Sequence, residues 1–407
     1  MHSPRKKIIF VVILVAVIGA IIYLESIKAP RVAPVTVLQT IQNSASTTTT
    51  ASSTVPPETG TSTGTGVALT PTQFLASRAS TIAQESQEYQ AAPEITDPSG
   101  FINTAPFKLS DFVGKKVVLV DFWTYSCINC IRTIPYLNAW YQKYKDDGLV
   151  IVGIHTPEFD FEHDINNVRA AVQKFGIQYP VVLDNNMGTW NAYGNLYWPH
   201  EYLINIDGFI VHDHIGEGDY AATEAAIQQA LEQRDEALGV TSTIMQTGIT
   251  NPTGTVSVDA ALVGSSETYF GAERNEYLAN GSQNQPGTQT LTIPASTQPN
   301  ALYLEGTWNF ADQYATNQTA NARILYQYSA KNVYMVASAD QPVTIQVLVD
   351  GKPVGALAGA DVSPTSSTAV IQANRLYSIV QGTDYGAHTL EIIVEDPGLH
   401  AFTFTFG

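Results

Sequence analysis

The sequence predicts an N-terminal apolar segment, then an α/β domain and then an all-β sandwich. Between residues 93 and 238, strand-like and helix-like segments alternate, which is typical of a mixed sheet covered by helices. From residue 266 to the C-terminus only short strand-like segments with polar turns occur, which predicts a β-sandwich of jelly-roll type. One uncharged apolar run, residues 8–24, stands close to the N-terminus.

The first 28 residues are typical of a membrane anchor. A basic cluster at residues 5–7 precedes the apolar run, whose length is near the lower limit of about 17–25 residues for crossing a bilayer. The cluster predicts that this end stays in the cytoplasm. A cleaved signal peptide begins in the same way, but no small-x-small cleavage site follows the run directly. We therefore expect a single uncleaved transmembrane helix over residues 1–28, with every later residue outside the cytoplasm, in the periplasm or at the cell surface.

Residues 29–92 predict a disordered linker. The stretches 44–54 and 59–66 are rich in serine, threonine and glycine, and they offer almost no apolar side chains that a core could bury. Such a chain cannot offset the entropy lost on ordering. We expect it to tether the folded domains flexibly to the membrane. A short helix over about residues 74–89 is the alternative for the last part of the segment.

The two cysteines of the chain, Cys127 and Cys130, have the spacing Cys-x-x-Cys. The apolar run 117–120 precedes them and is typical of a buried parallel strand. After them, apolar residues recur at three- and four-residue spacing, which predicts one face of a helix. These residues are Ile131, Ile134, Leu137, Tyr141 and Tyr144. Cys127 is therefore expected where a strand ends and a helix begins.

That position favours redox chemistry. Free backbone N–H groups and the positive end of the helix dipole stabilise a thiolate at a helix start. A thiolate attacks disulfides, and Cys130, one helical turn later, is placed to resolve the mixed disulfide. A structural zinc site would need about four ligands, and the sequence has no second Cys-x-x-Cys pair. Two inert core cysteines are a weaker alternative. We predict a redox-active disulfide between Cys127 and Cys130 that needs no further cofactor.

Two polar residues near the pair have predicted roles. Asp121 follows the apolar strand, where a lone carboxyl is expensive to bury unless it is paired or protonated. Burial would raise its pKa and suit it to exchanging a proton with Cys130; a strand-end carboxylate facing water is the alternative. Asn129, inside the pair, is expected to tune the redox potential through hydrogen bonding at the helix start.

The remainder of residues 93–238 completes the α/β unit. Asp207-Gly208 is a strong type I′ turn signal and predicts a hairpin. The predicted order is therefore β-α-β-α-β-β-α. Besides the cysteine strand and helix, the expected strands are 148–155, 202–206 and 209–214, and the expected helices are 164–175 and 220–238. Residues 179–183 are expected to add an edge or short strand, and residues 190–193 a helical turn.

This order and the cysteine motif resemble the thioredoxin fold in its TlpA/ResA-like branch. Further motifs resemble the C-terminal portion of DipZ-type proteins, from about residue 101 to the C-terminus. The matching stretches are Phe122-Trp123-Thr-Tyr-Ser-Cys127-Ile-Asn-Cys130, Gly153-Ile-His-Thr-Pro-Glu158-Phe, Trp190-Asn-Ala-Tyr-Gly-Asn, Tyr197-Trp198-Pro199 and Gly216-Glu-Gly-Asp-Tyr220.

The resemblance implies roles for several residues. Asp121 matches a buried carboxylate that is thought to shuttle the proton of the resolving thiol. Trp198-Pro199 stands where the family has a cis-proline beside the redox pair, which implies exposed backbone with which a substrate polypeptide can pair. Trp123 and Trp198 are expected to support the site.

The resemblance also has departures. DipZ-type proteins carry a multi-span CcdA-like membrane domain that supplies electrons from the cytoplasm, and here a single apolar run stands in its place. This implies that the protein either receives electrons from a separate membrane donor of CcdA type or works as an oxidant. Many ResA-like reductases have an acidic residue three positions after the second cysteine, where this chain has Thr133. Glu158 is a candidate for the missing carboxylate, and a loop residue that bonds backbone is the alternative.

Two further patterns give weaker hypotheses. His212 and His214 share one strand face and could bind a metal with Glu162 or His163, although a solvated strand face is the stronger interpretation. Thr124-x-x-Cys127 resembles the motif of peroxiredoxins, but the proline expected four residues before the threonine is Val120. A thiol peroxidase of the AhpC/TSA-redoxin type is therefore an alternative function.

Residues 239–265 are expected to be a connector, and residues 266–407 resemble the galactose-binding-like sandwiches that often serve as carbohydrate-binding modules. Asp350-Gly351 predicts a hairpin turn. Aromatic side chains could stack on a sugar; the candidates are Trp308, Tyr303, Tyr314 and Tyr377. The expected strands are 288–293, 301–305, 322–328, 332–338, 342–349, 368–380, 387–395 and 400–406.

The net charge of −17 speaks against nucleic acid as a partner. Two functions of different classes remain. The first is a membrane-anchored thiol–disulfide oxidoreductase, for which the resemblance implies extracytoplasmic thiol proteins as substrates, with apocytochromes c and a role in cytochrome c biogenesis as one candidate. The second is a cell-surface glycan-binding protein in which the α/β unit is a scaffold. The cysteine pair with its acid and proline favours the enzyme.

Overall fold

The structure is a computed structural model that describes residues 71–242, 244 and 250–407. The predicted anchor over residues 1–28 and most of the predicted linker lie outside these residues. Within the described ranges, no helix is both long enough and apolar enough to cross a membrane.

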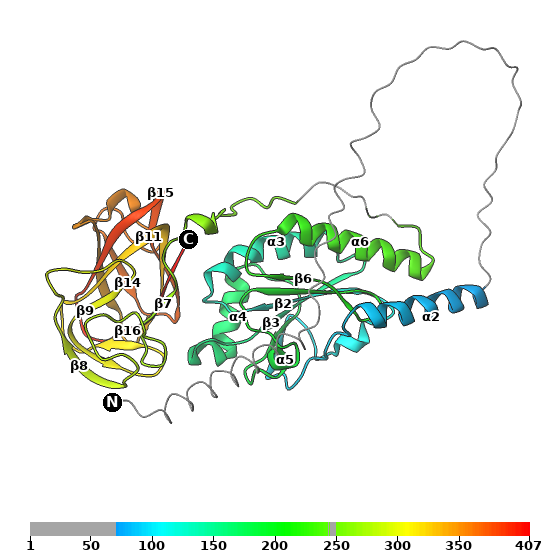
Figure 1. The fold of residues 1–407 in the computed structure, drawn as a ribbon, viewed down its shortest axis with the longest axis horizontal. Coiled ribbons are helices and arrows are strands. Elements are labelled where there is room, and N and C mark those ends of the chain that lie inside the picture. The colour runs from blue at the N-terminus through cyan, green and yellow to red at the C-terminus, as the bar shows by residue number, and fades with distance from the viewer. Residues whose placement is uncertain (1–70, 243, 245–249) are drawn as a thin grey trace, which may run out of the picture. The chain divides into compact units, whose positions relative to one another are not determined.

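A six-stranded mixed sheet forms the centre of the α/β domain (Figure 1). The strand order is β1-β4-β3-β2-β5-β6, in which β2, β3 and β4 are parallel and the other pairings are antiparallel. The two central parallel strands are almost completely buried, which explains their continuous apolar sequences. The strands are β1 (Gly100–Ile102), β2 (Val117–Trp123), β3 (Leu149–His155), β4 (Val181–Leu183), β5 (His200–Ile204) and β6 (Ile210–Ile215).

Helices cover both faces of this sheet. Side chains of α3, α4 and α6 pack with those of Leu119, Trp123 and Leu203 on one face. Short helix α5 packs with Val120 and Phe122 on the other face. The helices are α3 (Ile128–Tyr144), α4 (Ile165–Lys174), α5 (Gly188–Ala192) and α6 (Tyr220–Leu238), and the short 3-10 turns are η1 (Leu109–Asp111) and η2 (Asp160–His163). The alternation predicted from the sequence is therefore present, with β1 as an additional strand.

The hairpin between β5 and β6 turns at the predicted Asp-Gly pair. Gly208 has a φ of 88°, a backbone conformation that glycine adopts without strain. The side chain of Asn205 accepts hydrogen bonds from the backbone N–H groups of Asp207 and Phe209 and so closes the turn.

A helix occupies the end of the segment that we expected to be a disordered linker. Helix α2 (Pro71–Glu88) is ordered by contacts beyond itself: Arg78 forms an ion pair with Asp207, and the N–H of Ala92, just after the helix, donates to the carbonyl of Gly208. The expectation of a disordered linker up to residue 92 was therefore wrong for this part, where the alternative of a short helix applies.

The C-terminal domain is a β-rich unit of ten strands. Eight of them follow the order β13-β12-β15-β11-β16-β10-β9-β8, and the other two pair beside this path, β14 with β12 and β7 with β16. All its strand pairings are antiparallel. The strands are β7 (Thr268–Tyr269), β8 (Gly287–Leu291), β9 (Leu302–Phe310), β10 (Ala315–Asn317), β11 (Ala322–Ala339), β12 (Val343–Val349), β13 (Lys352–Pro353), β14 (Thr368–Ile371), β15 (Arg375–Val394) and β16 (Leu399–Phe406), with η3 (Ala260–Leu262) and η4 (Gly355–Leu357).

Two strands of this domain are longer than we expected. Strand β11 joins the expected strands 322–328 and 332–338, and β15 joins the end of the expected strand 368–380 to most of the expected strand 387–395. Register shifts in the β11–β15 pairing, between Ala330 and Asn332 and between Val333 and Tyr334, let β11 continue where the polar sequence predicted a break. The first part of β11 pairs with β9, and the last part pairs with β16. One strand therefore pairs with different neighbours in its first and last parts.

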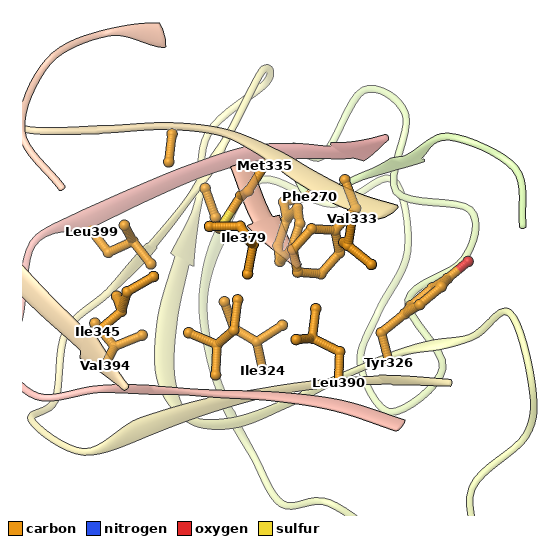
Figure 2. Close-up of a cluster of buried hydrophobic side chains, with 14 of the residues drawn as sticks. Phe270, Ile324, Tyr326, Val333, Met335, Ile345, Ile379, Leu390, Val394 and Leu399 are labelled. Atoms are coloured by element: carbon orange, nitrogen blue, oxygen red, sulfur yellow. The ribbon is translucent and has the colours of Figure 1, made fainter. Parts of the chain in front are cut away.

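Buried apolar side chains form one core cluster in this domain. Figure 2 shows Met335 and Ile379 pointing toward Ile324 and Leu390, and all four side chains are at most 1% exposed. Their burial supplies the main apolar stabilisation of the domain. The jelly-roll connection order stays a prediction.

The proposed sugar platform was wrong for most of its members. Trp308 and Tyr377 are at most 1% exposed, and Tyr303 is also buried. Their ring faces pack inside the domain, so they cannot stack on a sugar from solvent. Tyr314 is partly exposed, and its ring packs near those of His400 and Phe402.

Candidate functional site

Cys127 is the N-cap residue of α3 and follows the end of β2 by four residues. The backbone N–H of Cys130 donates a hydrogen bond to the sulfur of Cys127 at 3.3 Å. Both cysteines are free thiols; Cys127 is partly exposed, whereas Cys130 is only 1% exposed. One sulfur is therefore available to a partner molecule at the start of a helix, and the other lies behind it.

The Trp198–Pro199 peptide bond is cis. The backbone carbonyl of Trp198 lies 3.8 Å from the sulfur of Cys127 and accepts its S–H hydrogen bond. The indole N–H of Trp198 donates to the carbonyl of Thr156 at 3.1 Å, which holds this segment in place. The structure therefore brings Pro199 and Trp198 next to the exposed cysteine.

Asp121 is completely buried in β2, at 1% exposure. Burial raises the pKa of its carboxyl from 3.8 to about 7. Burial also raises the pKa of the Cys130 thiol well above its usual value, and the nearby Cys127 and Asp121 add to that rise. Near neutral pH, Asp121 can therefore both accept and give up a proton beside a thiol that does not lose its proton easily.

Trp123 and His155 form a buried aromatic pair under this site, with ring centroids 5.1 Å apart. Burial lowers the pKa of His155 to about 3, so its imidazole is neutral at ordinary pH. Thr124 is fully buried, and its hydroxyl lies 3.4 Å from Nε2 of His155. A threonine in this position does not present its hydroxyl to solvent as a peroxide-binding group would.

Asn129 does not bond the free N–H groups at the helix start. Its side-chain oxygen accepts a hydrogen bond from Arg132 at 2.8 Å, one helical turn further on. Arg132 in turn forms a two-point ion pair with Glu217, at 2.6 and 3.0 Å. Asn129 therefore bonds a buried arginine that is also held by Glu217.

Glu158, the expected substitute for a missing carboxylate, is engaged elsewhere. Its Oε1 atom accepts hydrogen bonds from Arg274 at 2.8 Å and from the hydroxyl of Tyr269 at 2.9 Å. The carboxylate that bonds the cysteine loop is Glu162 instead.

Glu162 is fully buried and had no predicted role at the cysteines. Its Oε1 atom accepts hydrogen bonds from the hydroxyl and N–H of Ser126, the residue before Cys127, at 2.6 and 3.3 Å. Its Oε2 atom accepts from the N–H groups of Glu158 and Phe159 at 2.7 and 3.0 Å. The sequence signal is weak, because an acid in a short polar turn looks like a surface residue.

Glu201 is a second buried carboxyl that sequence reasoning missed. It stands directly opposite Asp121 in the antiparallel pairing of β2 and β5, and it is also 1% exposed. The predicted strand began one residue later, at Tyr202, so Glu201 was left outside it. Its position two residues after Pro199 at the head of an apolar strand was the available signal.

The hypothesis of a metal at His212 and His214 finds no set of ligands. Among the residues that the structure describes, no three or more histidine, cysteine or carboxylate side chains converge so as to hold a metal ion. Nε2 of His212 lies 3.3 Å from the hydroxyl of Thr223 instead.

Comparison with known proteins extends these observations. Residues 89–213 match the family model described as AhpC/TSA family, and residues 265–407 match the model described as thioredoxin like C-terminal domain. Protein DipZ of Mycobacterium tuberculosis is 38% identical over 332 residues, which cover 80% of this chain and 44% of DipZ. The thiol-disulfide oxidoreductase ResA of Bacillus anthracis is 32% identical over 120 residues, or 27% of this chain and 66% of ResA.

This chain thus spans less than half the length of DipZ. A solved structure of a thioredoxin-like protein in the oxidized form has 25% identity over 36% of this chain and 97% of that protein, with a TM-score of 0.34. The predicted resemblance to DipZ and ResA is confirmed by the sequence identity with those two proteins. Residues 89–213 therefore form a thioredoxin-like domain of the AhpC/TSA family, in a chain that is similar to DipZ and ResA.

Proposed function

We propose that this protein is a membrane-anchored, extracytoplasmic thiol–disulfide oxidoreductase that reduces disulfides of other proteins. The observation that carries the proposal is the pair of cysteines at the start of α3. Cys127 is partly exposed and accepts the N–H of Cys130, whereas Cys130 is buried near Asp121. This difference in exposure suits the sulfur of Cys127 to attack a substrate disulfide and the sulfur of Cys130 to resolve the mixed disulfide.

In the first step, the thiolate of Cys127 attacks one sulfur of a substrate disulfide. A mixed disulfide forms between Cys127 and the substrate, and the other substrate sulfur leaves as a thiolate that takes up a proton. The helix N-terminus stabilises the attacking thiolate, since the N–H of Cys130 points at its sulfur.

In the second step, Cys130 attacks the sulfur of Cys127 and releases the second substrate thiolate. The two substrate sulfurs have then gained two electrons, and Cys127 and Cys130 have lost two and form a disulfide. Cys130 must lose its proton for this step, although burial raises its pKa. We assign Asp121 to accept that proton, since its own pKa of about 7 allows both protonation states.

Pro199 and Trp198 are assigned to substrate orientation. The carbonyl of Trp198 already faces the sulfur of Cys127 at 3.8 Å. A substrate polypeptide that pairs with backbone here would bring its disulfide to the attacking sulfur.

The sequence supports the proposed location and partners. The apolar run over residues 8–24 and its basic flank support a single-pass anchor with the folded domains outside the cytoplasm. The oxidised pair needs two electrons per cycle, and we assign these to a separate membrane donor of CcdA type. Thiol proteins outside the cytoplasm, apocytochromes c among them, are the substrate class. A carbohydrate ligand of the C-terminal domain stays a prediction.

The test uses the full-length chain, reduced and purified in detergent micelles, with insulin as a model disulfide protein. One insulin disulfide should be reduced for each Cys127–Cys130 disulfide formed, as measured by mass spectrometry after alkylation. The Cys127→Ser variant should leave insulin unchanged. Intact insulin disulfides after incubation with the reduced wild-type protein would show that the proposal is wrong.

A further inference from the structure

Three ionisable side chains stand in one row across the sheet of the α/β domain. Asp121 in β2 is directly opposite Glu201 in β5, and Glu201 is directly opposite His214 in β6. Side chains at directly opposed positions of an antiparallel pair point to the same face, with Cβ atoms about 5 Å apart. Strand β6 is at the edge of the sheet, so the row leads from the centre of the sheet to its edge.

The polar atoms of this row are buried and poorly satisfied. Among the described residues, Oδ1 of Asp121, both carboxyl oxygens of Glu201 and Nε2 of His214 have no hydrogen-bond partner of good geometry. Asp121 and Glu201 are each 1% exposed, whereas His214 is partly exposed. Two unsatisfied buried carboxyl groups cost stability, so a fold that keeps them indicates a use for them.

Glu201 is surrounded by other titratable groups. Burial raises its pKa well above the usual value, the charge of Asp121 raises it further, and the hydroxyl of Thr223 offsets part of the rise. Two carboxyl groups this close do not ionise independently and hold protons as a pair. The titratable groups that face Glu201 are Asp121 from β2, His212 and His214 from β6, Tyr220 from α6 and Tyr179 from the segment before β4.

We propose that Glu201 links Asp121 to His214 and thereby carries the proton between the buried Cys130 and the edge of the sheet. This rests on the proposed function, because it gives the resolving step of that reaction a route for its proton. Glu201 does not touch the reacting sulfurs. It is a positioning residue that acts through Asp121.

The proton transfers balance along the row. The S–H bond of Cys130 breaks and an O–H bond forms on Asp121, while the sulfur of Cys130 bonds to that of Cys127. Glu201 then gives its proton to Nε2 of His214 and takes the proton of Asp121. His214 releases a proton to water at the edge of the sheet, so one proton leaves the protein. Each transfer joins neighbouring groups, directly or through one water.

The face that carries the row explains why a route is needed. Helices α3 and α6 cover this face, and Cys130 lies in the same apolar cluster as Trp123 and Leu203. Water therefore has no open path to the thiol of Cys130, which is 1% exposed. The row of polar side chains through this apolar cluster can carry the proton in place of water.

The test follows the two thiols separately, with 5,5′-dithiobis(2-nitrobenzoate) as the oxidant and the full-length chain in detergent micelles. Attack by Cys127 releases the first nitrothiobenzoate and leaves a mixed disulfide. Attack by Cys130 on Cys127 releases the second nitrothiobenzoate and completes the two-electron oxidation. The first release tests the attacking thiol, and a wild-type protein without a second release would overturn the proposed function itself.

Glu201→Gln should slow the second release about tenfold near pH 7. The expected loss is smaller than the roughly 100-fold or more that a positioned acid or base usually contributes, because Glu201 acts through Asp121. The first release should keep its rate. The second release should also become dependent on buffer concentration, since a small buffer must then carry the proton. Asp213→Asn is the matched control: it neutralises a carboxylate on the same strand, next to His214 but on the opposite face.

His214→Ala gives a second test in case Glu201→Gln does not fold. The second release should slow in this variant, and added imidazole should restore it, because imidazole can occupy the space of the lost side chain. A purely structural role would not produce this rescue. If Glu201→Gln folds and matches Asp213→Asn in the rate and pH profile of the second release, or if imidazole does not rescue His214→Ala, the proton route is wrong while the oxidoreductase stands.

Discussion

The N–H of Cys130 and the sulfur of Cys127 are joined by a hydrogen bond of 3.3 Å at the first turn of α3. The side chain of Cys127 therefore caps its own helix, a role usually taken by serine, threonine, aspartate or asparagine. A negatively charged sulfur at this position benefits from both the N–H group and the helix dipole. The two cysteines are one helical turn apart, so their side chains lie on the same face of the helix and their sulfurs can bond.

Replacement of the two cysteines should have different effects. Cys127→Ser should abolish disulfide reduction, because no attacking sulfur remains. Cys130→Ser should stop after the first step and accumulate a mixed disulfide of about one substrate per protein molecule. Mass spectrometry without a reducing agent distinguishes the two. A mixed disulfide on Cys130 in the Cys127→Ser variant would reverse the assigned roles.

Asp121→Asn should make the protein more stable at pH 8. Burial raises the pKa of Asp121 from 3.8 to about 7 in the folded state. Between these values the folded protein binds more protons than the unfolded chain, so wild-type stability falls as the pH rises through this window. The shift corresponds to a penalty on the order of 4 kcal/mol above pH 7.

Urea unfolding of both proteins at pH 4 and pH 8 measures this difference. The stability gained by Asp121→Asn should be present at pH 8 and largely absent at pH 4. The same variant should slow the resolving step, because the acceptor for the Cys130 proton is lost. An Asp121→Asn protein that is equally destabilised at both pH values would mean that the carboxyl is not buried in this way.

Glu162→Gln should loosen the loop that carries Cys127. The carboxylate of Glu162 accepts hydrogen bonds from Ser126, Glu158 and Phe159. The amide nitrogen of glutamine would face one of these donors, at a cost of about 1–3 kcal/mol in the free energy of unfolding. Glu236→Gln, at an exposed position of α6, is the control and should change stability by less than about 0.5 kcal/mol. Equal urea midpoints for the two variants would show that Glu162 does not stabilise the loop that carries Cys127.

Gly153→Ala should destabilise the protein because strand β3 approaches the site closely at this residue. A Cβ atom there would lie 2.9 Å from Nε1 of Trp123 and 3.2 Å from the ring of Tyr179, both fully buried. Overpacking of this kind costs about 1–3 kcal/mol. Gly100→Ala in β1 is the control, since its nearest neighbour is a terminal methyl of Ile165 at 3.3 Å. Thermal unfolding should separate the two variants, and a tolerated Gly153→Ala would show that the cluster has spare room.

Local patterns in the sequence were sufficient for the α/β unit and its cysteines. The apolar run 117–120, the cysteine spacing and the helical period after Cys130 all depend on neighbours along the chain. Features that depend on distant partners were missed. Glu201 became part of the site only through its pairing with Asp121, and Glu162 only through its bonds to Ser126.

The C-terminal domain illustrates the same limit. The polar stretch around Asn332 predicted an interruption, but pairing with β15 and β16 carries β11 through it. The aromatic residues proposed as a sugar platform turned inward, Trp308 and Tyr377 among them, because burial of a ring cannot be read from its spacing. Helix α2 likewise has a distant partner, since its Arg78 forms an ion pair with Asp207.

The most direct test of the proposed reductase is the reduction potential of the Cys127–Cys130 pair, measured on the full-length chain in detergent against glutathione and dithiothreitol buffers. A reductase should have a potential near that of thioredoxin, about −270 mV, or lower. A potential near about −120 mV, as in a strong oxidant, would contradict the proposed direction of electron flow. Absence of a disulfide at every potential would contradict the redox function itself.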